Sequence, residues 1–324
     1  METVRAETRP LPLVTIVCPV FNEEQTVPLF FERLVPAIAE IQSKVRIELL
    51  FVNNRSTDGT LAKIAEIEAD HPWVHHITFS RNYGYQASIT AGMRHAKGDA
   101  IVNIDVDCED PPEMLPRFID KWLGGVDVAY GIRDKREEFF LVHWVRKLFY
   151  RVTRQIADHE IVLDMAEFFL VDKRVRDHVL STRSTFPFVR GQVGYVGFRR
   201  EGIPYKRQRR ISGETHYNLI SAGRFGIGGI LSSSTMPLRL LAYVGVLAIV
   251  LDFALALVVV LCGESWGLRP VDRALIAVLA VHAGWFMLAL GALGIYLARV
   301  YKDTINLPLY VVDSKASQYS LPPS

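Results

Sequence analysis

The sequence has little cysteine and little net charge, and each scarcity excludes a class of protein. Cysteine occurs three times, at Cys18, Cys108 and Cys262, an odd and unclustered set that argues against a disulfide framework or a zinc site. We expect them to be reduced space-filling residues in a protein that faces the cytosol. The formal net charge is only +2, so whole-chain electrostatics do not indicate nucleic-acid binding. Residues 1–12 are charged and lack an apolar core, and we expect no signal peptide there.

Hydrophobic residues, in contrast, are plentiful and make up 50% of the chain. Two runs, residues 240–262 and 274–298, are each long enough for the roughly 20 apolar residues that cross a bilayer. The short segment 263–273 joins them, so the sequence predicts a transmembrane hairpin. The alternative is two buried helices of a soluble domain. Basic residues next to the hairpin favour placing both termini in the cytoplasm, in a multi-pass protein of the cytoplasmic membrane.

The N-terminal part of the chain shows the alternation of an α/β fold. Apolar, β-rich segments predict strands, and the segments between them predict helices. The expected strands are 13–17, 47–52, 76–79, 100–104 and 126–130. The first expected helix is capped by Asn22 or Glu23 and continues through Leu34. Two more helices are expected over 61–69 and 86–96. This order predicts a mostly parallel sheet. In such sheets ligands bind beyond the carboxyl ends of the strands.

The segment after the fourth expected strand carries two carboxylates, Asp105 and Asp107, two residues apart. In a short turn both side chains can reach one hard cation such as Mg²⁺ or Mn²⁺, which prefers oxygen ligands and shares them with substrate phosphates. The alternative is a solvated turn, because Asp-x-Asp also occurs by chance. The preceding buried strand favours the metal site.

Five segments, in order, resemble the motifs of the family 2 glycosyltransferases. They are residues 19–23, 54–60, 80–86, 96–100 and 105–113. Within that family the chain looks most like the polyprenyl-phosphate sugar transferases, the group that contains dolichyl-phosphate mannose synthase and the bacterial undecaprenyl-phosphate glucosyltransferases. The resemblance implies a GT-A type, Rossmann-like catalytic domain over residues 1–235, a transmembrane hairpin over 236–300 and a cytosolic tail over 301–324.

The resemblance also implies roles for individual residues. Asp107 and Glu167 are the expected catalytic carboxylates, and Asp105 and Asp107 the expected metal ligands. The expected donor-binding residues are Pro19, Phe21, Asn22, Glu23, Asn54, Ser56, Arg81, Asn82, Gly84, Gln86, Asp105, Val106, Arg210 and Ser212. The expected ligands of the acceptor phosphate are Arg133, Arg136, Arg146 and Tyr150. Guanidinium groups suit such contacts because they bind phosphate through two parallel hydrogen bonds. The alternative for a basic cluster is a solvated surface.

Two positions depart from the family pattern. Asn54 stands where the motif usually carries an acidic residue that contacts the donor base, and an amide can still accept one hydrogen bond and donate another. Glu167 replaces the usual catalytic aspartate, and Phe169 replaces an arginine. The extra methylene of Glu167 moves its carboxylate by about one bond length.

The expected reaction is transfer of a hexose, from UDP-glucose, onto undecaprenyl phosphate with inversion. Other donors, namely GDP-mannose, UDP-N-acetylglucosamine and UDP-galactose, stay open. Two other functions also stay open. One is a processive polysaccharide synthase, although the Gln-x-x-Arg-Trp motif of such enzymes is absent from the sequence. The other is a non-catalytic scaffold. Residues 137–158 and 218–234 have the composition of helices that lie along a membrane, or of ordinary helices with a basic face.

Three further expectations concern assembly and the spans. Residues 307–313 form an extended segment in a tail that packs on a neighbour in a homo-oligomer, by resemblance a tetramer. Asp252 and His282 interrupt otherwise apolar spans and differ in depth by about one helical turn, which would let them pair. The alternative is that each finds its own backbone or water partner.

Overall fold

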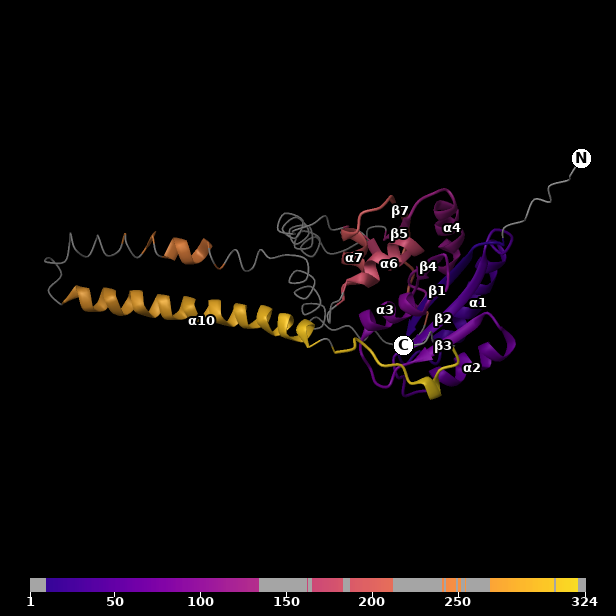
Figure 1. The fold of residues 1–324 in the computed structure, drawn as a ribbon, viewed down its shortest axis with the longest axis horizontal. Helices are drawn as coiled ribbons and strands as arrows, with labels where there is room; N and C mark the ends of the chain where they lie inside the picture. The colour runs from indigo at the N-terminus through magenta and orange to yellow at the C-terminus, as the bar shows by residue number, and fades with distance from the viewer. Residues whose placement is uncertain are drawn as a thin grey trace, which may run out of the picture.

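The computed structural model describes residues 10–133, 162, 165–182, 187–211, 241, 243–248, 250–251, 254, 269–305 and 307–319. They form an α/β domain, a long helix that extends away from it, and a C-terminal tail that returns to the domain (Figure 1). The strands are β1 Leu13–Val20, β2 Arg46–Asn53, β3 Val74–Thr78, β4 Ala100–Asn103, β5 Val128–Arg133, β6 Met165–Asp172 and β7 Arg200–Tyr205. The main helices are α1 Thr26–Ala39, α2 Thr60–Asp70, α3 Tyr85–His95, α4 Leu115–Leu123, α6 Lys173–Ser181, α7 Val189–Tyr195 and α10 Pro270–Thr304, with short 3₁₀ turns at Pro112–Met114 and Ser314–Ala316.

The strands form one sheet in the order β3-β2-β1-β4-β6-β5-β7. Neighbouring strands are parallel except at β6, which runs antiparallel to β4 and β5. The mostly parallel sheet predicted from the sequence is thus confirmed. The strands are near-continuous apolar runs because helices cover both faces of the sheet; in β2, for example, the last six residues are all buried.

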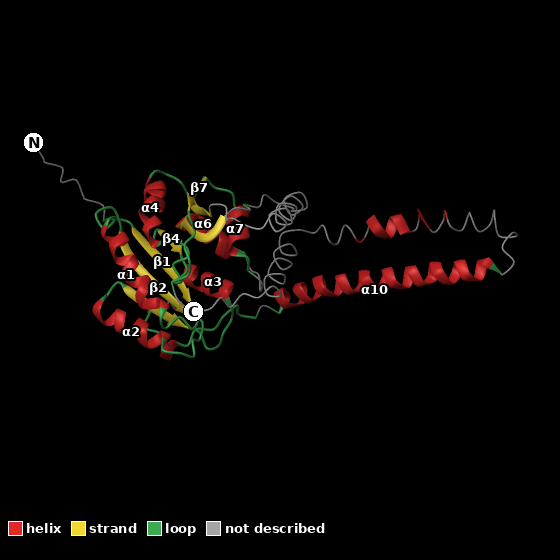
Figure 2. Cartoon of the chain, turned by 180° about the vertical axis from the view of Figure 1, so that it is seen from behind, coloured by secondary structure: helices red, strands yellow, loops and turns green. Residues whose placement is uncertain are grey.

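Two apolar cores lie on opposite faces of this sheet. On one face the core contains side chains of α1, α2 and α4, among them Phe30, Ile64 and Phe118. On the other face it contains side chains of α3, α6 and α7, and also Tyr319 from the C-terminal tail. The domain therefore has three layers, which is visible from both sides (Figures 1 and 2).

The start of α1 differs from the prediction. Neither Asn22 nor Glu23 caps the helix, which begins at Thr26 after Gln25 and continues beyond Leu34 to Ala39. Asn22 has a positive φ of 56° and its side-chain oxygen accepts a hydrogen bond from Thr57 N at 2.8 Å. The expected capping group is instead used to join the loops that follow β1 and β2.

Helix α10 contains the predicted span 274–298 and leaves the α/β domain as a long rod (Figure 2). Its part His282–Thr304 is long and apolar enough to cross a membrane, with no burial inside the chain, and it is the one such helix among the described residues. Most of the predicted span 240–262 lies outside the described residues. Residues 243–248 are helical and lie beside α10, and a Cβ on Gly245 would be 3.4 Å from Trp285 Nε1. The first arm of the hairpin stays a prediction.

The predicted pair of Asp252 and His282 also stays a prediction, because Asp252 lies outside the described residues. His282 Nδ1 is 2.9 Å from the carbonyl oxygen of Val278, one turn earlier in α10. This contact matches the alternative in which the histidine finds a backbone partner.

The C-terminal tail, residues 307–319, packs on the α/β domain of its own chain. Val312 forms an isolated antiparallel bridge with Phe79, directly after β3, and Tyr319 is buried in the second core. The predicted extended segment is confirmed. The expectation that the tail packs on a neighbour in a homo-oligomer stays a prediction, and the contacts described here lie within one chain.

Candidate active site

Four loops meet at the carboxyl edge of the sheet, after β1, β2, β3 and β4. The backbone of Asn22 donates to Ser56 Oγ at 3.0 Å, which joins the first loop to the second. Asn54 Nδ2 donates to Asn82 Oδ1 at 3.0 Å, and Tyr83 N donates to Asn54 Oδ1 at 2.8 Å, which joins the second loop to the third. The residues expected to bind the donor therefore lie together, as the sheet topology requires.

The backbone at this edge is strained. Asn22, Arg55 and Cys108 have φ values of 56°, 63° and 55°, and they lie in the loops after β1, β2 and β4. Residues other than glycine rarely adopt this region, and such outliers gather at binding sites where surrounding structure holds them. Gly84, at the start of α3, has a φ of 91°, which a side chain would oppose. The strain marks this edge as a candidate functional site.

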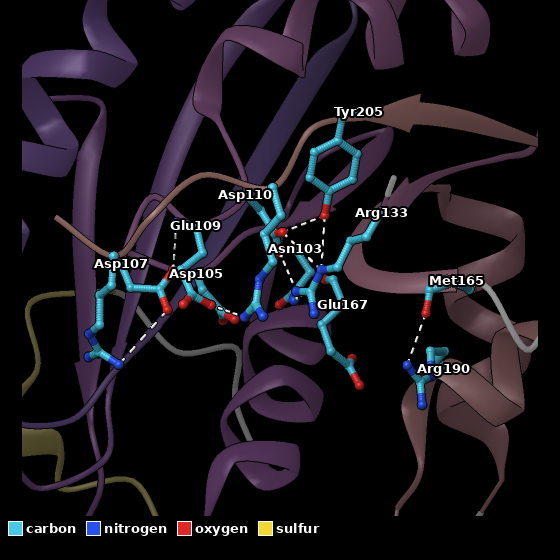
Figure 3. Close-up of polar contacts among 12 residues, drawn as sticks. Asn103, Asp105, Asp107, Glu109, Asp110, Arg133, Met165, Glu167, Arg190 and Tyr205 are labelled. Atoms are coloured by element: carbon cyan, nitrogen blue, oxygen red, sulfur yellow. Dashed lines mark hydrogen bonds and ion pairs between the residues drawn. The ribbon is translucent and has the colours of Figure 1, made fainter. Parts of the chain in front are cut away.

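Asp105 and Asp107 follow β4 and come together as the sequence predicts (Figure 3). Asp105 Oδ1 accepts a hydrogen bond from Tyr85 OH at 2.7 Å. Burial, followed by the charge of Asp107, raises the pKa of Asp105 from 3.8 to about 8. Burial also raises the pKa of Asp107, whereas Arg210, with Nη1 at 3.9 Å from Asp107 Oδ2, lowers it. Two carboxyl groups thus lie close together with too little positive charge to ionise both.

This pair fits a divalent cation. The described residues contain no group of three or more His, Cys, Asp or Glu side chains that could hold a metal by themselves. Mg²⁺ and Mn²⁺ do not need one, because they bind through one or two carboxylates together with substrate phosphates and water. The chemistry of this donor set supports the fit: two carboxyl groups lie close together, and burial raises the pKa of each, an effect that a bound cation would oppose.

Glu167 lies on β6, beside the acidic pair and facing the same space (Figure 3). Its Oε2 atom is buried and has no hydrogen-bond partner in the part of the chain that the structure describes. Burial raises the pKa of Glu167, and the charges of Arg190 and Arg133 oppose this rise. The amide of Gln86 also lies close enough to lower that pKa, although Gln86 Nε2 forms no hydrogen bond of acceptable geometry. A buried carboxyl oxygen without a partner is the kind of group that a ligand completes.

The basic run at residues 206–210 crosses over the acidic turn. Arg207 forms an ion pair with Glu109, and Arg210 forms one with Glu23. The backbone follows the same course, because Gln208 N donates to the carbonyl oxygen of Glu109 at 2.9 Å. The run therefore covers the turn that carries Asp107. Ser212, expected to act with Arg210, lies outside the described residues.

Arg133, expected to bind the acceptor phosphate, is already engaged. Its Nε and Nη2 atoms bond both carboxyl oxygens of Asp110 at 3.1 and 2.8 Å, and its Nε also bonds Tyr205 OH at 3.2 Å. Asp110 is 1% exposed and also accepts a hydrogen bond from Tyr205. Arg133 thus has a structural partner, and its half-exposed guanidinium borders Glu167 (Figure 3). The other acceptor residues, Arg136, Arg146 and Tyr150, lie outside the described residues, as does segment 137–158.

The remaining donor residues occupy the rim of the same edge. Phe21 is exposed after β1, and Val106 is buried between the two aspartates. Arg81 stacks on Tyr83 with its guanidinium carbon 4.0 Å from the ring centre. Gln86, in the first turn of α3, accepts a hydrogen bond from Val189 N at 3.0 Å. Pro19 lies in β1, paired with Val52 of β2.

Several residues of the site were not predicted as such. Tyr85 bonds Asp105, Asn103 Nδ2 donates to the carbonyl oxygen of Glu167 at 2.7 Å, and Arg190 Nη1 donates to the carbonyl oxygen of Met165 at 2.9 Å. Tyr85 and Asp110 are inside motif segments, so the motifs contained a signal for them. Arg190 is 23 residues after Glu167 along the chain, and only packing of α7 against β6 brings it near.

Comparison with known proteins agrees with this geometry. The family model described as "Glycosyl transferase family 2" matches residues 15–180. An uncharacterized glycosyltransferase of Bacillus subtilis, YkcC, is 37% identical over 301 residues, which cover 92% of this chain and 92% of the relative. The Escherichia coli prophage bactoprenol glucosyl transferase homolog is 31% identical over 302 residues, 92% of this chain and 98% of the relative.

One solved structure with a similar chain is the mannosyltransferase PcManGT from Pyrobaculum calidifontis in complex with GDP-Man and Mn²⁺. It is 16% identical and has a TM-score of 0.47 over 91% of this chain and 88% of that one. The bactoprenol glucosyl transferase of Shigella phage SfX is 29% identical, over 93% of this chain and 99% of the relative. On the match of the family model and the full-length relatives, the chain belongs to glycosyl transferase family 2.

Proposed function

We propose that this glycosyltransferase moves glucose from UDP-glucose onto a polyprenyl phosphate, of the undecaprenyl type, at the cytoplasmic face of the membrane. The bactoprenol glucosyl transferases among its relatives support the acceptor and the sugar. The observation that carries the chemistry is the partly buried pair Asp105 and Asp107 near Glu167, whose Oε2 atom has no hydrogen-bond partner among the described residues. These carboxyl groups lie near one another at the edge of the sheet where the donor loops meet.

The bond changes follow from the charges of the two substrates. An oxygen of the polyprenyl phosphate attacks the anomeric carbon, the bond from that carbon to the diphosphate breaks, and UDP leaves. The attacking phosphate has a second pKa near ~6 and is already an anion at neutral pH, so no strong base is needed. Attack from the side opposite the leaving group inverts the configuration, turning an α-linked donor into a β-linked product.

The protein's own side chains would bind and orient the substrates. Asp105 and Asp107 would hold Mg²⁺ or Mn²⁺, which when bound neutralises charge on the leaving diphosphate. Arg210, which now pairs with Glu23, lies close enough to Asp107 to turn toward the same diphosphate. Glu167 would accept a hydrogen bond from a sugar hydroxyl and orient the hexose rather than remove a proton.

The acceptor phosphate would lie between Glu167 and the basic residues that follow β5. Arg133 lies beside this position and already forms two hydrogen bonds with Asp110. We propose that Asp110 fixes the orientation of the guanidinium, and that the N–H groups of Arg133 that do not bond Asp110 bind the phosphate. Arg136, Arg146 and Tyr150 are proposed to complete the phosphate site.

Helix α10 supports a membrane location for the reaction. Its apolar side chains are exposed along its length, and its C-terminal end leads within a few residues to the tail beside β3. We propose that α10 is one arm of the hairpin, that segments 137–158 and 218–234 lie at the membrane surface, and that both termini are cytoplasmic. A homo-oligomer, by resemblance a tetramer, would let tails and spans pack on neighbouring subunits.

A donor and acceptor panel tests the proposal. Full-length protein in mild detergent is incubated with Mn²⁺, undecaprenyl phosphate and one of UDP-glucose, UDP-galactose, UDP-N-acetylglucosamine or GDP-mannose, and release of nucleoside diphosphate is measured. UDP-glucose is expected to give the highest rate, and only with the lipid present. Preference for another donor would correct the sugar, a growing polymer would indicate a synthase, and no release from any donor would contradict the enzyme assignment.

A further inference from the structure

The C-terminal tail contacts two of the loops that are proposed to bind the donor. Ser80 N donates to the carbonyl oxygen of Val311 at 2.9 Å, and Asp313 N donates to the carbonyl oxygen of Thr78 at 2.8 Å. These two bonds flank the bridge between Phe79 and Val312. The tail thus pairs with the chain at the point where β3 ends and the donor loop begins.

Aromatic rings continue this contact toward the donor residues. Tyr310 of the tail stacks on Phe79, with ring centres 5.1 Å apart and planes at 19°. Tyr83 meets Phe79 edge-on at 5.7 Å, and Arg81 lies over the ring of Tyr83. Because Tyr83 N also bonds Asn54 Oδ1, a displacement of Phe79 would reach both the second and the third loop.

An ion pair joins the tail directly to the loop after β2. Arg55 Nη1 is 3.4 Å from Asp313 Oδ2, and Arg55 holds a left-handed φ of 63°. The same Asp313 donates its backbone N–H to Thr78 at the end of β3. One tail residue therefore binds both loops and restrains a backbone that is otherwise strained.

The tail is anchored independently at its other end. Tyr319 OH donates to Glu48 Oε1 at 3.0 Å, near the start of β2 and away from the donor loops. His76 Nε2 lies 3.0 Å from the carbonyl oxygen of Ala316, and Thr78 N donates to Ser317 Oγ at 2.9 Å. The chain between α10 and this anchor is short, since α10 ends at Thr304.

We propose that the tail is a positioning segment for the nucleotide-sugar. It holds the loops after β2 and β3 in their donor-binding arrangement and connects them to the end of α10. The proposal rests on the donor site proposed above. Arg55 and Asp313 are positioning residues, since they act through Asn54, Asn82 and Tyr83 rather than through contact with the sugar.

Hydrogen exchange of the full-length protein tests the restraint without any ligand. Arg55→Ala and Asp313→Ala are expected to speed amide exchange in residues 54–58 and 79–84 by about threefold, as for loss of an exposed ion pair. Strands β1 and β4 should be unchanged. Tyr319→Phe is the matched control, because it removes one tail hydrogen bond at the anchor and leaves the loop contacts in place. Unchanged exchange in both loops, or equal acceleration by Tyr319→Phe, would overturn the proposal.

Kinetics test the consequence for the donor. Arg55→Ala and Asp313→Ala should each raise KM for UDP-glucose about fivefold, with kcat and KM for undecaprenyl phosphate unchanged. The double variant should be no worse than Asp313→Ala alone, because that substitution already removes the ion pair with Arg55 as well as the bond that Asp313 Oδ1 accepts from Lys315 N. A purely structural role would lower the melting temperature and the amount of active enzyme, and would leave KM for UDP-glucose unchanged; that result would overturn the proposal.

A third measurement, together with the two above, separates this inference from the proposed function. Calorimetry measures the binding of UDP with Mn²⁺, and of GDP with Mn²⁺ as a second probe, by the wild type and the same variants. A wild-type protein that binds UDP but transfers no glucose would refute the proposed reaction and leave the tail proposal standing on the exchange and binding results. A wild-type protein that transfers glucose, with variants unaltered in exchange and in KM, would refute the tail proposal alone.

Discussion

At the carboxyl edge of the sheet, ionisable side chains are buried, whereas along α10 large apolar side chains are exposed. Asp105 is partly buried, which raises its pKa to about 8, and Glu167 Oε2 has no hydrogen-bond partner among the described residues. In α10, Met287 is 67% exposed and Leu297 is 69% exposed. Both regions oppose the usual distribution, in which charges stay in water unless they are paired and apolar groups are covered.

Each region fits a partner outside the described residues, and the two partners differ in kind. Positive charge and hydrogen-bond donors would complete the sheet edge, which fits a divalent cation with a diphosphate. Hydrocarbon would complete α10, which fits a lipid bilayer. The two partners meet in one reaction if the acceptor is a phosphate on a lipid.

The largest effect on activity is expected from replacing Asp107, the proposed metal ligand at the carboxyl edge of the sheet. Asp107→Asn should lower kcat by about 10³-fold, because it weakens stabilisation of the leaving diphosphate. The fold should persist, since an asparagine oxygen can still accept the bond from Glu109 N, now 3.0 Å from Asp107 Oδ1. UDP release and the melting temperature check this together. A rate near that of the wild type would exclude Asp107 as a metal ligand.

The next effect concerns α10. Leu288→Asp near the middle of the helix should weaken membrane insertion by about 3 kcal/mol, or about 10²-fold, on insertion scales for a helix centre. Extraction of membranes with alkaline carbonate measures it, and the variant should move toward the soluble fraction. Leu123→Asp on α4, where Leu123 is 46% exposed, is the matched control and should not alter extraction. Equal behaviour of the two variants would mean that lipid does not cover α10.

A third change tests the role of Glu167. Glu167→Gln should lower kcat by about 10²-fold, the lower end of general acid–base contributions, because the phosphate nucleophile is already ionised. KM for the lipid should change little. Loss comparable to that of Asp107→Asn would contradict this estimate and would mean that proton transfer or sugar orientation by Glu167 contributes more than assigned here.

The smallest effect is a pH dependence of metal binding. Burial raises the pKa of Asp105 from 3.8 to about 8, so below pH 8 a cation must displace its proton. Affinity for Mn²⁺ should therefore rise as the pH rises, by up to about tenfold per unit, and level off above pH 8. Titration followed by the electron paramagnetic resonance signal of free Mn²⁺ measures this. Asp105→Asn should bind more weakly and flatten the slope, and a slope unchanged by that substitution would contradict the assignment.

In the absence of metal, the stability of the fold should also depend on the ionisation of Asp105, but it should fall as the pH rises, whereas the affinity for metal should rise. Because the pKa of Asp105 is higher in the folded protein than its ordinary 3.8, the folded state binds more protons between these values. The contribution of this carboxyl to stability is then present at low pH and is lost as the pH rises from about 4 to about 8. Mn²⁺ should raise the melting temperature most at the upper end of that range.

Much of the fold was predictable from sequence because strand and helix patterns are local. The first four strands and the helices between them appear where the apolar runs and polar breaks place them, and the exposed apolar helix α10 contains its predicted span. The cap of α1 was wrongly predicted because Asn22 bonds Thr57, which lies 35 residues away. Strand β6 was not predicted, since its direction depends on pairing with both β4 and β5.

The sequence alone determined the family, the acidic pair and the apolar helix, because each is encoded by residues that are neighbours along the chain or repeat at a short spacing. Tertiary structure alone decided three other matters. It raised the pKa of Asp105 through burial, it paired Arg133 with Asp110, and it placed the tail beside β3. Each depends on contacts between distant residues or on removal from water, and these arise only when the chain has packed.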